Sequence, residues 1–292
     1  MPAQGWRECG IWQADLPRRR RVESTPHVLI GLCGAHFSHA LLDLLDLLAW
    51  LWCLSDPSLF SSRPALAGFR MHGLNKDPTR WPGFLTDMLI VLDLAPGEVW
   101  FRDGAVGYRS LYLPRRILPF GPGGVGAPYF RTTRQIGERV VGTAVGSIEK
   151  IYLSSRKLLA DPRRTQGDGE AQLEALFLAW GFEIIHPQDL SLAEQIRIFR
   201  AARYLTGPVG SQLHLAVFCT TPGVQLFRIA PSFFNHDVDA KIMTGVGGAV
   251  QTFVVPAVTT AEKDQSLSTW GLDPAVADQV AQAVDAWLGA TR

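Results

Sequence analysis

Apolar and polar positions follow two different periods over the second half of the chain. Four short apolar runs have the length and composition of buried strands: 148–153, 182–185, 203–206 and 224–229. Amphipathic segments with helical spacing lie between them, at about 170–180, 191–202 and 211–218. Strands that alternate with helices predict an α/β unit with a parallel sheet, whose ligands bind at the carboxyl ends of the strands.

Polar and glycine-rich sequences stand at these expected strand ends. Ser-Ser-Arg-Lys at 154–157 follows the first strand, and its two cations suit a phosphate. Gly-Pro-Val-Gly-Ser at 207–211 follows the third strand and predicts a tight turn whose exposed amides attract an anion. This turn is neither GxGxxG nor a P-loop, so it does not specify NAD or ATP. Ser-Leu-Ala-Glu at 191–194 predicts a helical capping box.

The first half and the C-terminus have weaker patterns. We expect buried strands at 27–30 and 88–92, a buried helix at 35–53, a hairpin or two short strands at 98–101 and 108–113, a strand at 251–255 and a helix at 274–288. Six Gly or Pro positions within 121–128 predict a linker. We therefore divide the chain into an N-terminal α/β lobe at 1–120, a linker at 121–135 and a C-terminal α/β lobe at 136–292.

The helix expected at 35–53 carries a polar stripe. His36, His39, Asp43 and Asp46 recur at steps of three and four residues, which places them on one side of the helix. Three interpretations remain open. The stripe faces solvent, or it binds a metal, or it lines a cleft where an imidazole paired with a carboxylate acts as a general base.

The composition is that of an ordinary globular protein. Among 292 residues, 47% are hydrophobic and 19% are charged, and a net charge of +1 argues against nucleic-acid binding through bulk electrostatics. The 4 cysteines form no CxxC, which favours a reduced, cytosolic protein over a disulfide scaffold or zinc module. The richest apolar run, 40–54, is shorter than the ~20 residues of a membrane span.

An ordered series of sequences resembles glycosyltransferase family 61, over roughly 27–230 and most strongly from 148 onward. The series is Ile151-Tyr-Leu-Ser-Ser-Arg156, Arg163-Arg164 to Glu170, Gly181-Phe-Glu-Ile-Ile185, Leu190-Ser-Leu-Ala-Glu194-Gln195 and Gly207-Pro-Val-Gly-Ser211. Phe37-Ser-His39, followed by Asp43, is similar to the family's Phe-x-His motif at the start of a helix. The chain looks like a bacterial member of the capsular polysaccharide or lipopolysaccharide type.

The resemblance implies a GT-B-like α/β fold, in which two Rossmann-like lobes face a central cleft. The lobe at 1–120 would lie on the acceptor side, and the lobe at 136–292 would bind the nucleotide sugar. It also implies an inverting, metal-independent hexosyl- or pentosyltransferase that acts in bacterial surface polysaccharide synthesis. The sugar would pass from a nucleotide-diphosphate donor, which is a substrate rather than a cofactor, to a hydroxyl of a glycan or lipid-linked glycan. We expect a cytoplasmic protein at the inner face of the membrane, with peripheral membrane association and no nucleic-acid partner.

The resemblance also implies roles for individual residues. His39, supported by Asp43, is the expected catalytic base that deprotonates the acceptor hydroxyl. The expected donor-binding residues are Arg156, Lys157 and Arg164 on the diphosphate, Glu170 and Glu194 on ribose or sugar hydroxyls, and Gly207, Gly210, Ser211 and His214 around the phosphate or nucleoside.

Three positions differ from the family's usual pattern. Val209 replaces a His of the glycine turn, Leu215 replaces an Asn of the following helix, and Gly169 replaces the Asn before Glu170. The first two changes keep an alternative open, namely a catalytically silent relative that binds nucleotide sugar or glycan as a partner protein. A Rossmann-type oxidoreductase is disfavoured, because no GxGxxG follows a strand.

Overall fold

The structure is a computed structural model of the chain, and it describes part of the 292 residues. The described residues are 22–23, 27–33, 41, 65–70, 77, 80–81, 83–91, 99–101, 107–108, 111–112, 127–142, 148–158, 167–234, 237–259, 269–271 and 274–290. The chain divides into two compact units, 1–116 and 117–292. Each unit is described by itself.

The second unit is built on a five-stranded sheet in which every neighbouring pair is parallel. Its strands are β7 (Lys150–Leu153), β9 (Glu183–Ile185), β10 (Tyr204–Pro208), β11 (Gln225–Pro231) and β12 (Ala249–Val255). The predicted parallel α/β sheet is therefore confirmed, and its architecture is Rossmann-like.

The strand order is β12-β11-β10-β7-β9. The chain starts at β7, adds β9 on one side, and then adds β10, β11 and β12 in turn on the other side. The direction of winding thus reverses between β7 and β10. In sheets of this kind, ligands bind beyond the carboxyl ends of the strands at this reversal point.

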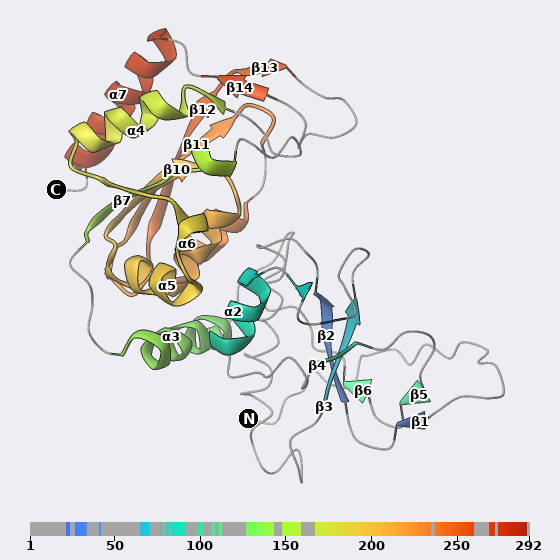
Figure 1. Ribbon diagram of the computed structural model, residues 1–292. Helices are drawn as coiled ribbons and strands as arrows, with labels where there is room; N and C mark the ends of the chain where they lie inside the picture. Colours follow the sequence, from blue (N-terminus) through green and yellow to red (C-terminus); the bar gives the residue numbers. More distant parts are fainter. Residues whose placement is uncertain are drawn as a thin grey trace. The chain divides into compact units, whose positions relative to one another are not determined.

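Helices cover both faces of this sheet (Figure 1). Figure 1 shows α4 (Glu170–Ala179) and α7 (Pro274–Ala290) over one face, with α5 (Leu192–Ala201) and α6 (Val238–Gly245) over the other. The 3₁₀ helix η6 (Ser211–Phe218) packs against α5 and α6, and α3 (Ala127–Val141) packs against α5.

Aromatic side chains form the core between the sheet and the pair α4 and α7. Tyr152 stacks on Phe177 with ring centroids 4.8 Å apart, while Trp287 contacts Tyr204 at 5.5 Å and Phe227 at 5.3 Å. All five belong to one cluster of buried residues. Burial of each such side chain stabilises the fold by roughly 1.5–3 kcal/mol.

The helices that flank the carboxyl end of β7 begin and end as their sequences predict. Gly169 adopts a left-handed conformation (φ 89°) directly before α4, and Gly181 (φ 77°) follows its end. The predicted capping box opens α5: the Ser191 hydroxyl accepts a hydrogen bond from the Glu194 amide at 3.3 Å, and the Ser191 amide donates to the Glu194 carboxylate at 2.8 Å.

Two predictions near the glycine turn need correction. Gly207 and Pro208 belong to β10, because they continue its pairing with Arg228 and Ile229 of β11. Residues 211–218 form a 3₁₀ helix rather than an α-helix. The Leu213 amide donates to the Gly210 carbonyl at 3.1 Å, the three-residue spacing of a 3₁₀ turn.

The segment that we expected to be a linker is partly helical. Helix α3 begins at Ala127, so the linker prediction for 121–135 is wrong from that residue onward. Pro128 lies in the first turn, where a helix tolerates proline. Tyr129, Thr133 and Ile136 are buried at helical spacing, and they bury one face of α3. The prediction overlooked this apolar face because the preceding glycines suggested a break.

The described part of the first unit contains a second parallel sheet, in the order β4-β3-β2-β6. Its strands are β2 (His27–Cys33), β3 (Ala65–Arg70), β4 (Val99–Phe101) and β6 (Leu111–Tyr112), and a small parallel pair joins β1 (Val22–Glu23) to β5 (Gly107–Tyr108). The strand predicted at 27–30 is confirmed. Of the two alternatives expected at 98–101 and 108–113, short strands are confirmed, and the hairpin is wrong because β4 pairs with β3 and β6 pairs with β2.

The strand predicted at 88–92 is also wrong, because this run belongs to helix α2 (Gly83–Val91). Leu85, Met88 and Leu89 are buried at steps of three and four residues, and Asp87 between them is only half-buried. Pro82 stands just before the helix, where proline favours a helix start. The short run Leu-Ile-Val at its end has the composition of a strand, and that composition misled the prediction.

The remaining elements close the second unit. β8 (Gly167–Asp168), β13 (Ala257–Thr259) and β14 (Thr269–Gly271) form a three-stranded sheet. The strand predicted at 251–255 and the helix predicted at 274–288 are confirmed by β12 and α7. The helix predicted at 35–53 lies outside the described residues, except for Leu41, which is helical and buried. Of the helices that the structure describes, none has the length and hydropathy needed to cross a membrane.

Candidate functional site

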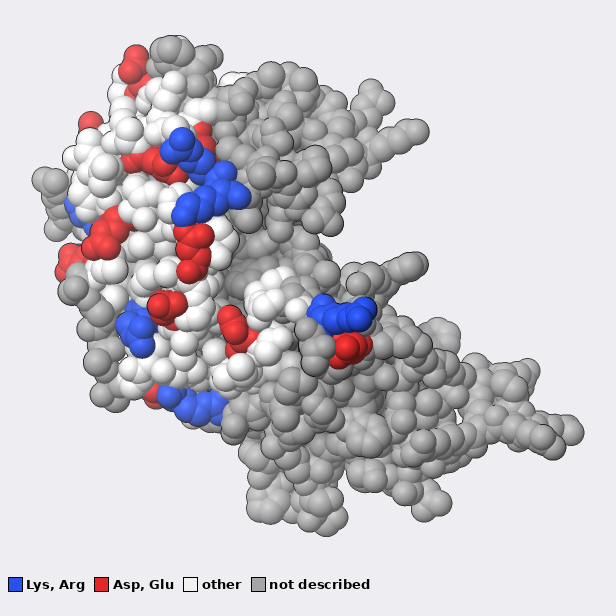
Figure 2. Space-filling view, viewed as in Figure 1, with Lys and Arg blue, Asp and Glu red and all other residues white. Residues whose placement is uncertain are grey.

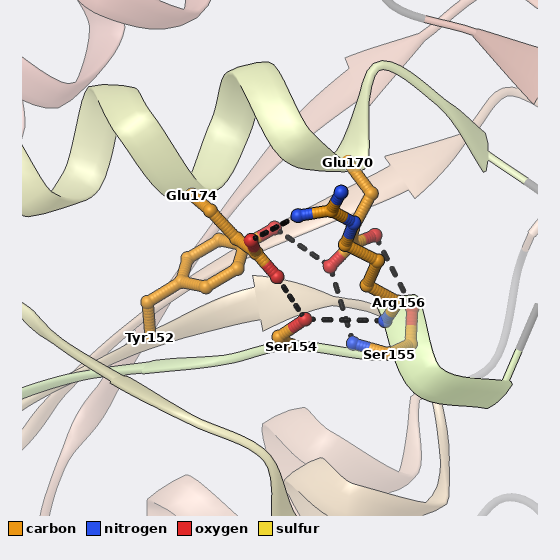
Figure 3. A network of polar contacts seen from close by, with 6 residues as sticks. All are labelled: Tyr152, Ser154, Ser155, Arg156, Glu170 and Glu174. Atoms are coloured by element: carbon orange, nitrogen blue, oxygen red, sulfur yellow. Dashed lines mark hydrogen bonds and ion pairs between the residues drawn. The ribbon is translucent and has the colours of Figure 1, made fainter.

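A polar cluster lies at the carboxyl end of β7, and it is centred on Glu170 (Figure 3). Glu170 is the first residue of α4, yet it is buried, because the side chain points back towards the strand. Its carboxylate accepts hydrogen bonds from the Tyr152 hydroxyl at 3.0 Å, from the Ser155 amide at 3.1 Å and from the Ser155 hydroxyl at 3.2 Å. Glu170 therefore ties the end of β7 to the start of α4.

Glu174 forms the second half of this cluster, one helical turn further along α4 (Figure 3). Its carboxylate accepts hydrogen bonds from the Ser154 hydroxyl at 2.5 Å and from Arg156 Nη1 at 3.2 Å. The Ser154 hydroxyl in turn accepts from the Arg156 amide at 3.1 Å. The two glutamates together hold all three residues of the turn Ser154-Ser155-Arg156.

The electrostatics of Glu170 are unfavourable for its charge. Burial raises the pKa of the Glu170 carboxyl above its usual value, and the nearby Glu174 carboxylate adds to the increase. The three hydrogen bonds lower the pKa without cancelling the effect of burial. Burial also raises the pKa of the Tyr152 hydroxyl well above 10, with a smaller contribution from the charge of Glu170.

The two expected phosphate-binding cations of this strand end are exposed and paired with carboxylates. Arg156 and Lys157 lie in a 3₁₀ turn (Arg156–Leu158), and their side chains are 56% and 50% exposed. Arg156 pairs with Glu174, and Lys157 pairs with Asp189. Exposed ion pairs contribute only about 0–1 kcal/mol, so a phosphate can compete for either cation at small cost.

The glycine turn lies at the end of β10, the strand next to β7. Gly207 has a φ of 154°, and a Cβ there would lie 2.6 Å from the Leu153 carbonyl oxygen of β7. Only glycine lets the two central strands approach this closely. The Gln212 side chain donates to the Pro208 carbonyl at 3.1 Å and packs against Gly210. The turn 207–211 thus stands beside the Ser154-Ser155-Arg156 turn across the reversal point of the sheet.

His214 belongs to a different polar cluster, on the α6 side of the sheet. Its Nε2 lies 3.6 Å from the Asp239 carboxylate of α6, and Arg228 Nη1 of β11 lies 3.1 Å from the other oxygen of Asp239. Arg228 Nε also donates to the Thr252 hydroxyl of β12 at 2.8 Å. Asp239 is buried, so this cluster joins η6, α6, β11 and β12 through one buried carboxylate.

The structure gives Glu194 a structural role. Both the side chain and the amide of Glu194 take part in the capping box with Ser191. The hydrogen bonds from Ser191 lower the pKa of the Glu194 carboxyl. The contacts described for Glu194 fully account for the residue as a helix cap.

Three expected site residues, His39, Asp43 and Arg164, lie outside the described residues. Among the described ones, the sheet brings the turns of Arg156 and of Gly207, Gly210 and Ser211 to the same edge, and Glu170 supports the first of these turns. His214 is held in the separate Asp239 cluster. The described residues include no group of three or more His, Cys, Asp or Glu placed to hold a metal ion.

Sequence reasoning missed Tyr152, Glu174, Arg228 and Asp239. A polar residue in an apolar strand was the available signal for Tyr152 and Arg228, because a buried polar group needs a partner. The spacing of Glu170 and Glu174 by four residues on one helix was the signal for Glu174. No local pattern distinguished Asp239 from its neighbours Asn235, His236 and Asp237.

Charges on the described surface are mixed. Figure 2 shows basic and acidic side chains interspersed on the face in view, without a large area of one sign among the described residues. The cations at the end of β7 follow this rule, because each has a carboxylate beside it. On the described part of this face, each cation at the end of β7 is therefore a local charge next to an opposite one rather than part of a broad field.

A comparison with protein families matches most of the chain to one family. Residues 37–225, more than half of the chain, match the family described as Glycosyltransferase 61. The matched region includes β7, α4, α5, β10 and the glycine turn. No curated protein matches the chain. The chain belongs to glycosyltransferase family 61.

Proposed function

We propose that this glycosyltransferase inverts the anomeric carbon of a nucleotide-diphosphate sugar and transfers the sugar to a hydroxyl of a glycan or lipid-linked glycan. One observation carries the donor site. The reversal point between β7 and β10 is flanked by the Ser154-Ser155-Arg156 turn and the glycine turn, and both lie within the family match. The pathway that we propose is bacterial capsular polysaccharide or lipopolysaccharide synthesis, at the cytoplasmic face of the membrane.

In this proposal the diphosphate binds between the two turns. Arg156 releases Glu174 and forms charge-assisted hydrogen bonds to the phosphate oxygens, which stabilises the leaving nucleoside diphosphate. Lys157 and Arg164 add positive charge, and the amides that follow Gly210 face the anion. The strand pairing supports this arrangement, since Leu153 and Gly207 approach closely at the ends of β7 and β10.

The proposed base is His39, with Asp43 orienting its imidazole. Support comes from the helical spacing of the two residues and from the similarity of the sequence Phe37-Ser-His39 to the family motif. A GT-B-like arrangement of two Rossmann-like lobes is part of the same proposal. The parallel sheets in both units are consistent with it. No step of the proposed reaction requires a metal.

A silent relative that binds nucleotide sugar without transfer is the second candidate. Val209 favours it, because a valine cannot supply the hydrogen bond of the histidine usual at that position. Leu215 is fully buried in the core, so this replacement leaves no polar group at that position of η6 for a ligand. Gly169 does not favour it, because Asn and Gly are the two residues that most readily adopt the left-handed conformation found there.

Donor binding followed by turnover tests the proposal. Isothermal titration calorimetry against UDP-, GDP- and CMP-sugars should show binding of at least one nucleotide-diphosphate sugar, and Arg156→Ala should weaken it about tenfold. A donor-hydrolysis assay then separates transferase from silent relative, because only a transferase consumes the donor. His39→Ala should abolish single-turnover transfer while donor affinity is unchanged. Full transfer by His39→Ala would show that the base is another residue.

A further inference from the structure

We propose that Glu170 is a positioning residue for the donor: its ionised carboxylate fixes the Ser154-Ser155-Arg156 turn from behind and does not touch the donor. The proposal rests on the proposed function, because it assumes that Arg156 meets the diphosphate. It replaces the expectation that Glu170 binds a ribose or sugar hydroxyl directly. The carboxylate is buried, and each of its described hydrogen bonds comes from β7 or from the turn that follows β7.

The direction of the Glu170 side chain is set by the backbone before it. Gly169 has φ 89° and ψ 5°, and no side chain caps the start of α4. This left-handed residue turns the chain sharply into the helix. The first helical side chain consequently points back to β7, as Figure 3 shows. The Glu170 carboxylate therefore does not cap its own helix. It accepts hydrogen bonds from β7 and from the turn after β7.

The hydrogen bonds then transmit this position to Arg156. Glu170 fixes both the amide and the hydroxyl of Ser155, the residue directly before Arg156. On the other side of the turn, the Ser154 hydroxyl accepts a hydrogen bond from the Arg156 amide and donates one to the Glu174 carboxylate. The backbone that carries the guanidinium is thus held at two consecutive residues. A displacement of Ser155 would move Arg156 away from the reversal point between β7 and β10.

A purely structural role does not explain why this residue is charged. The titratable and charged groups that face Glu170 among the described residues are Tyr152 on β7 and Glu174 on its own helix. Arg156, the basic residue drawn in Figure 3, pairs with Glu174 instead. Within the described part of the chain, this buried carboxylate therefore has no cationic partner, an arrangement that costs stability and occurs preferentially at functional sites.

The test compares wild type with Glu170→Gln, which keeps the shape and one carbonyl acceptor but removes the charge. The probe is the nucleotide-diphosphate sugar that binds wild type most tightly in calorimetry. We expect the variant to bind it about tenfold more weakly at neutral pH, the size of a lost charge-assisted hydrogen bond. Glu183→Gln, which changes an exposed glutamate on β9, is the matched control and should bind as wild type does.

The pH profile distinguishes positioning from a merely structural role. Wild-type donor affinity should fall as the pH decreases and Glu170 takes up a proton, while the affinity of Glu170→Gln should stay flat and low. Measurement of donor binding rather than turnover separates this profile from the proposed general-base step of His39. Thermal unfolding of the variant should show no loss of stability, because the substitution removes an uncompensated buried charge.

Three outcomes would overturn the inference in different ways. If wild type and Glu170→Gln bind the donor equally at every pH, Glu170 does not position the site, and the proposed function stands. If Glu170→Gln loses stability and affinity together, with an unchanged pH profile, its role is structural. If wild type binds no nucleotide sugar of the panel, the proposed function and this inference both fail.

A second variant protects the test against a folding defect in Glu170→Gln. Ser155→Ala deletes the hydroxyl that donates to Glu170 and leaves the carboxylate and the backbone bond in place. It should weaken donor binding by a few-fold and retain the acid-dependent loss of affinity. Unchanged donor affinity in Ser155→Ala together with a flat wild-type profile would overturn the proposal, whatever the stability of Glu170→Gln.

Discussion

Two buried carboxylates, Glu170 and Asp239, lie on opposite faces of the same sheet. Basic side chains surround Asp239, whereas neutral hydrogen-bond donors surround Glu170. Each is 3% exposed. Asp239 lies 3.1 Å from the guanidinium of Arg228 and 3.6 Å from the imidazole of His214. Glu170 accepts hydrogen bonds only from neutral groups among its described contacts, namely Tyr152 and Ser155.

The difference shows what each carboxylate contributes. A cation beside a buried carboxylate compensates its charge, so Asp239 connects η6, α6 and β11 as part of the scaffold. Neutral donors satisfy the lone pairs of Glu170 but leave its charge uncompensated, and burial raises the pKa of its carboxyl. The first arrangement serves stability, and the second is the kind that a ligand site maintains at some cost to stability.

The largest effect is expected from breaking the compensated pair. Asp239→Ala leaves the mostly buried Arg228 without its carboxylate, and this should lower the free energy of unfolding by about 3–5 kcal/mol. Urea denaturation measures the change. The double variant Arg228→Met/Asp239→Ala should recover most of the loss, because no unpaired charge remains. Equal destabilisation in the single and double variants would contradict the assignment of Asp239 as a charge partner.

A smaller effect is expected from removing one neutral donor of Glu170. Tyr152→Phe deletes the hydroxyl that donates to the carboxylate, at a cost of about 1 kcal/mol in the free energy of unfolding. Because this hydrogen bond lowers the pKa of Glu170, its loss should raise that pKa further. Donor affinity, followed by calorimetry over a pH series, should then decline at higher pH than in wild type. If donor affinity declines at the same pH as in wild type, the Tyr152 hydroxyl does not influence the protonation of Glu170.

Neutralising Glu170 itself should change stability less than Tyr152→Phe does at neutral pH, but should alter the pH dependence of stability. The folded protein holds the Glu170 proton more tightly than the unfolded chain does, so the contribution of this group is greatest at low pH and is lost as the pH rises through the raised pKa. Glu170→Gln should lie within about 1 kcal/mol of wild type at neutral pH. Wild type should gain relative to the variant on acidification. Urea denaturation at several pH values measures this difference. A loss of wild-type stability relative to Glu170→Gln on acidification would contradict the prediction.

Glu194 is an exposed carboxylate whose pKa is shifted in the opposite direction to that of Glu170. The smallest effect is expected from its substitution. Its pKa is lowered by Ser191, so its stabilising contribution is present above the unfolded pKa and is lost as the pH falls through the lowered folded pKa. Glu194→Gln should leave donor affinity unchanged. It should have a lower thermal stability than wild type only above the pH range in which Glu194 loses its proton. A loss of donor affinity in this variant would return Glu194 to the donor site.

Local features of the sequence predicted much of the second unit. The capping box at Ser191 and Glu194 depends on residues three apart, and the apolar runs of β7, β9, β10 and β11 are each self-contained. Predictions failed where composition and position conflict. The run at the end of α2 looks like a strand by composition, and the glycines before Ala127 concealed the helical spacing of α3.

The site was less predictable because its contacts cross the fold. Glu170 was selected from the sequence, but its partner Tyr152 is 18 positions away and its burial depends on how α4 packs on the sheet. The order of the strands decides that the ends of β7 and β10 meet, and no residue pattern encodes that order directly. Nothing in the sequence indicated that the Glu170 side chain is buried, because that burial comes from the packing of α4 on the sheet.

The strand order also determines when this protein can fold. Every neighbouring pair in the five-stranded sheet is parallel, so no hairpin can nucleate the sheet. Lys150 of β7 cannot pair until Tyr204 of β10 has been synthesised. Sheets with such distant pairings form slowly, and incomplete chains expose their strand edges. On the ribosome, the central pair can close only after Pro208 has left the exit tunnel. The candidate donor site therefore forms late in synthesis, and the hydrophobic core is complete only after α7 has followed.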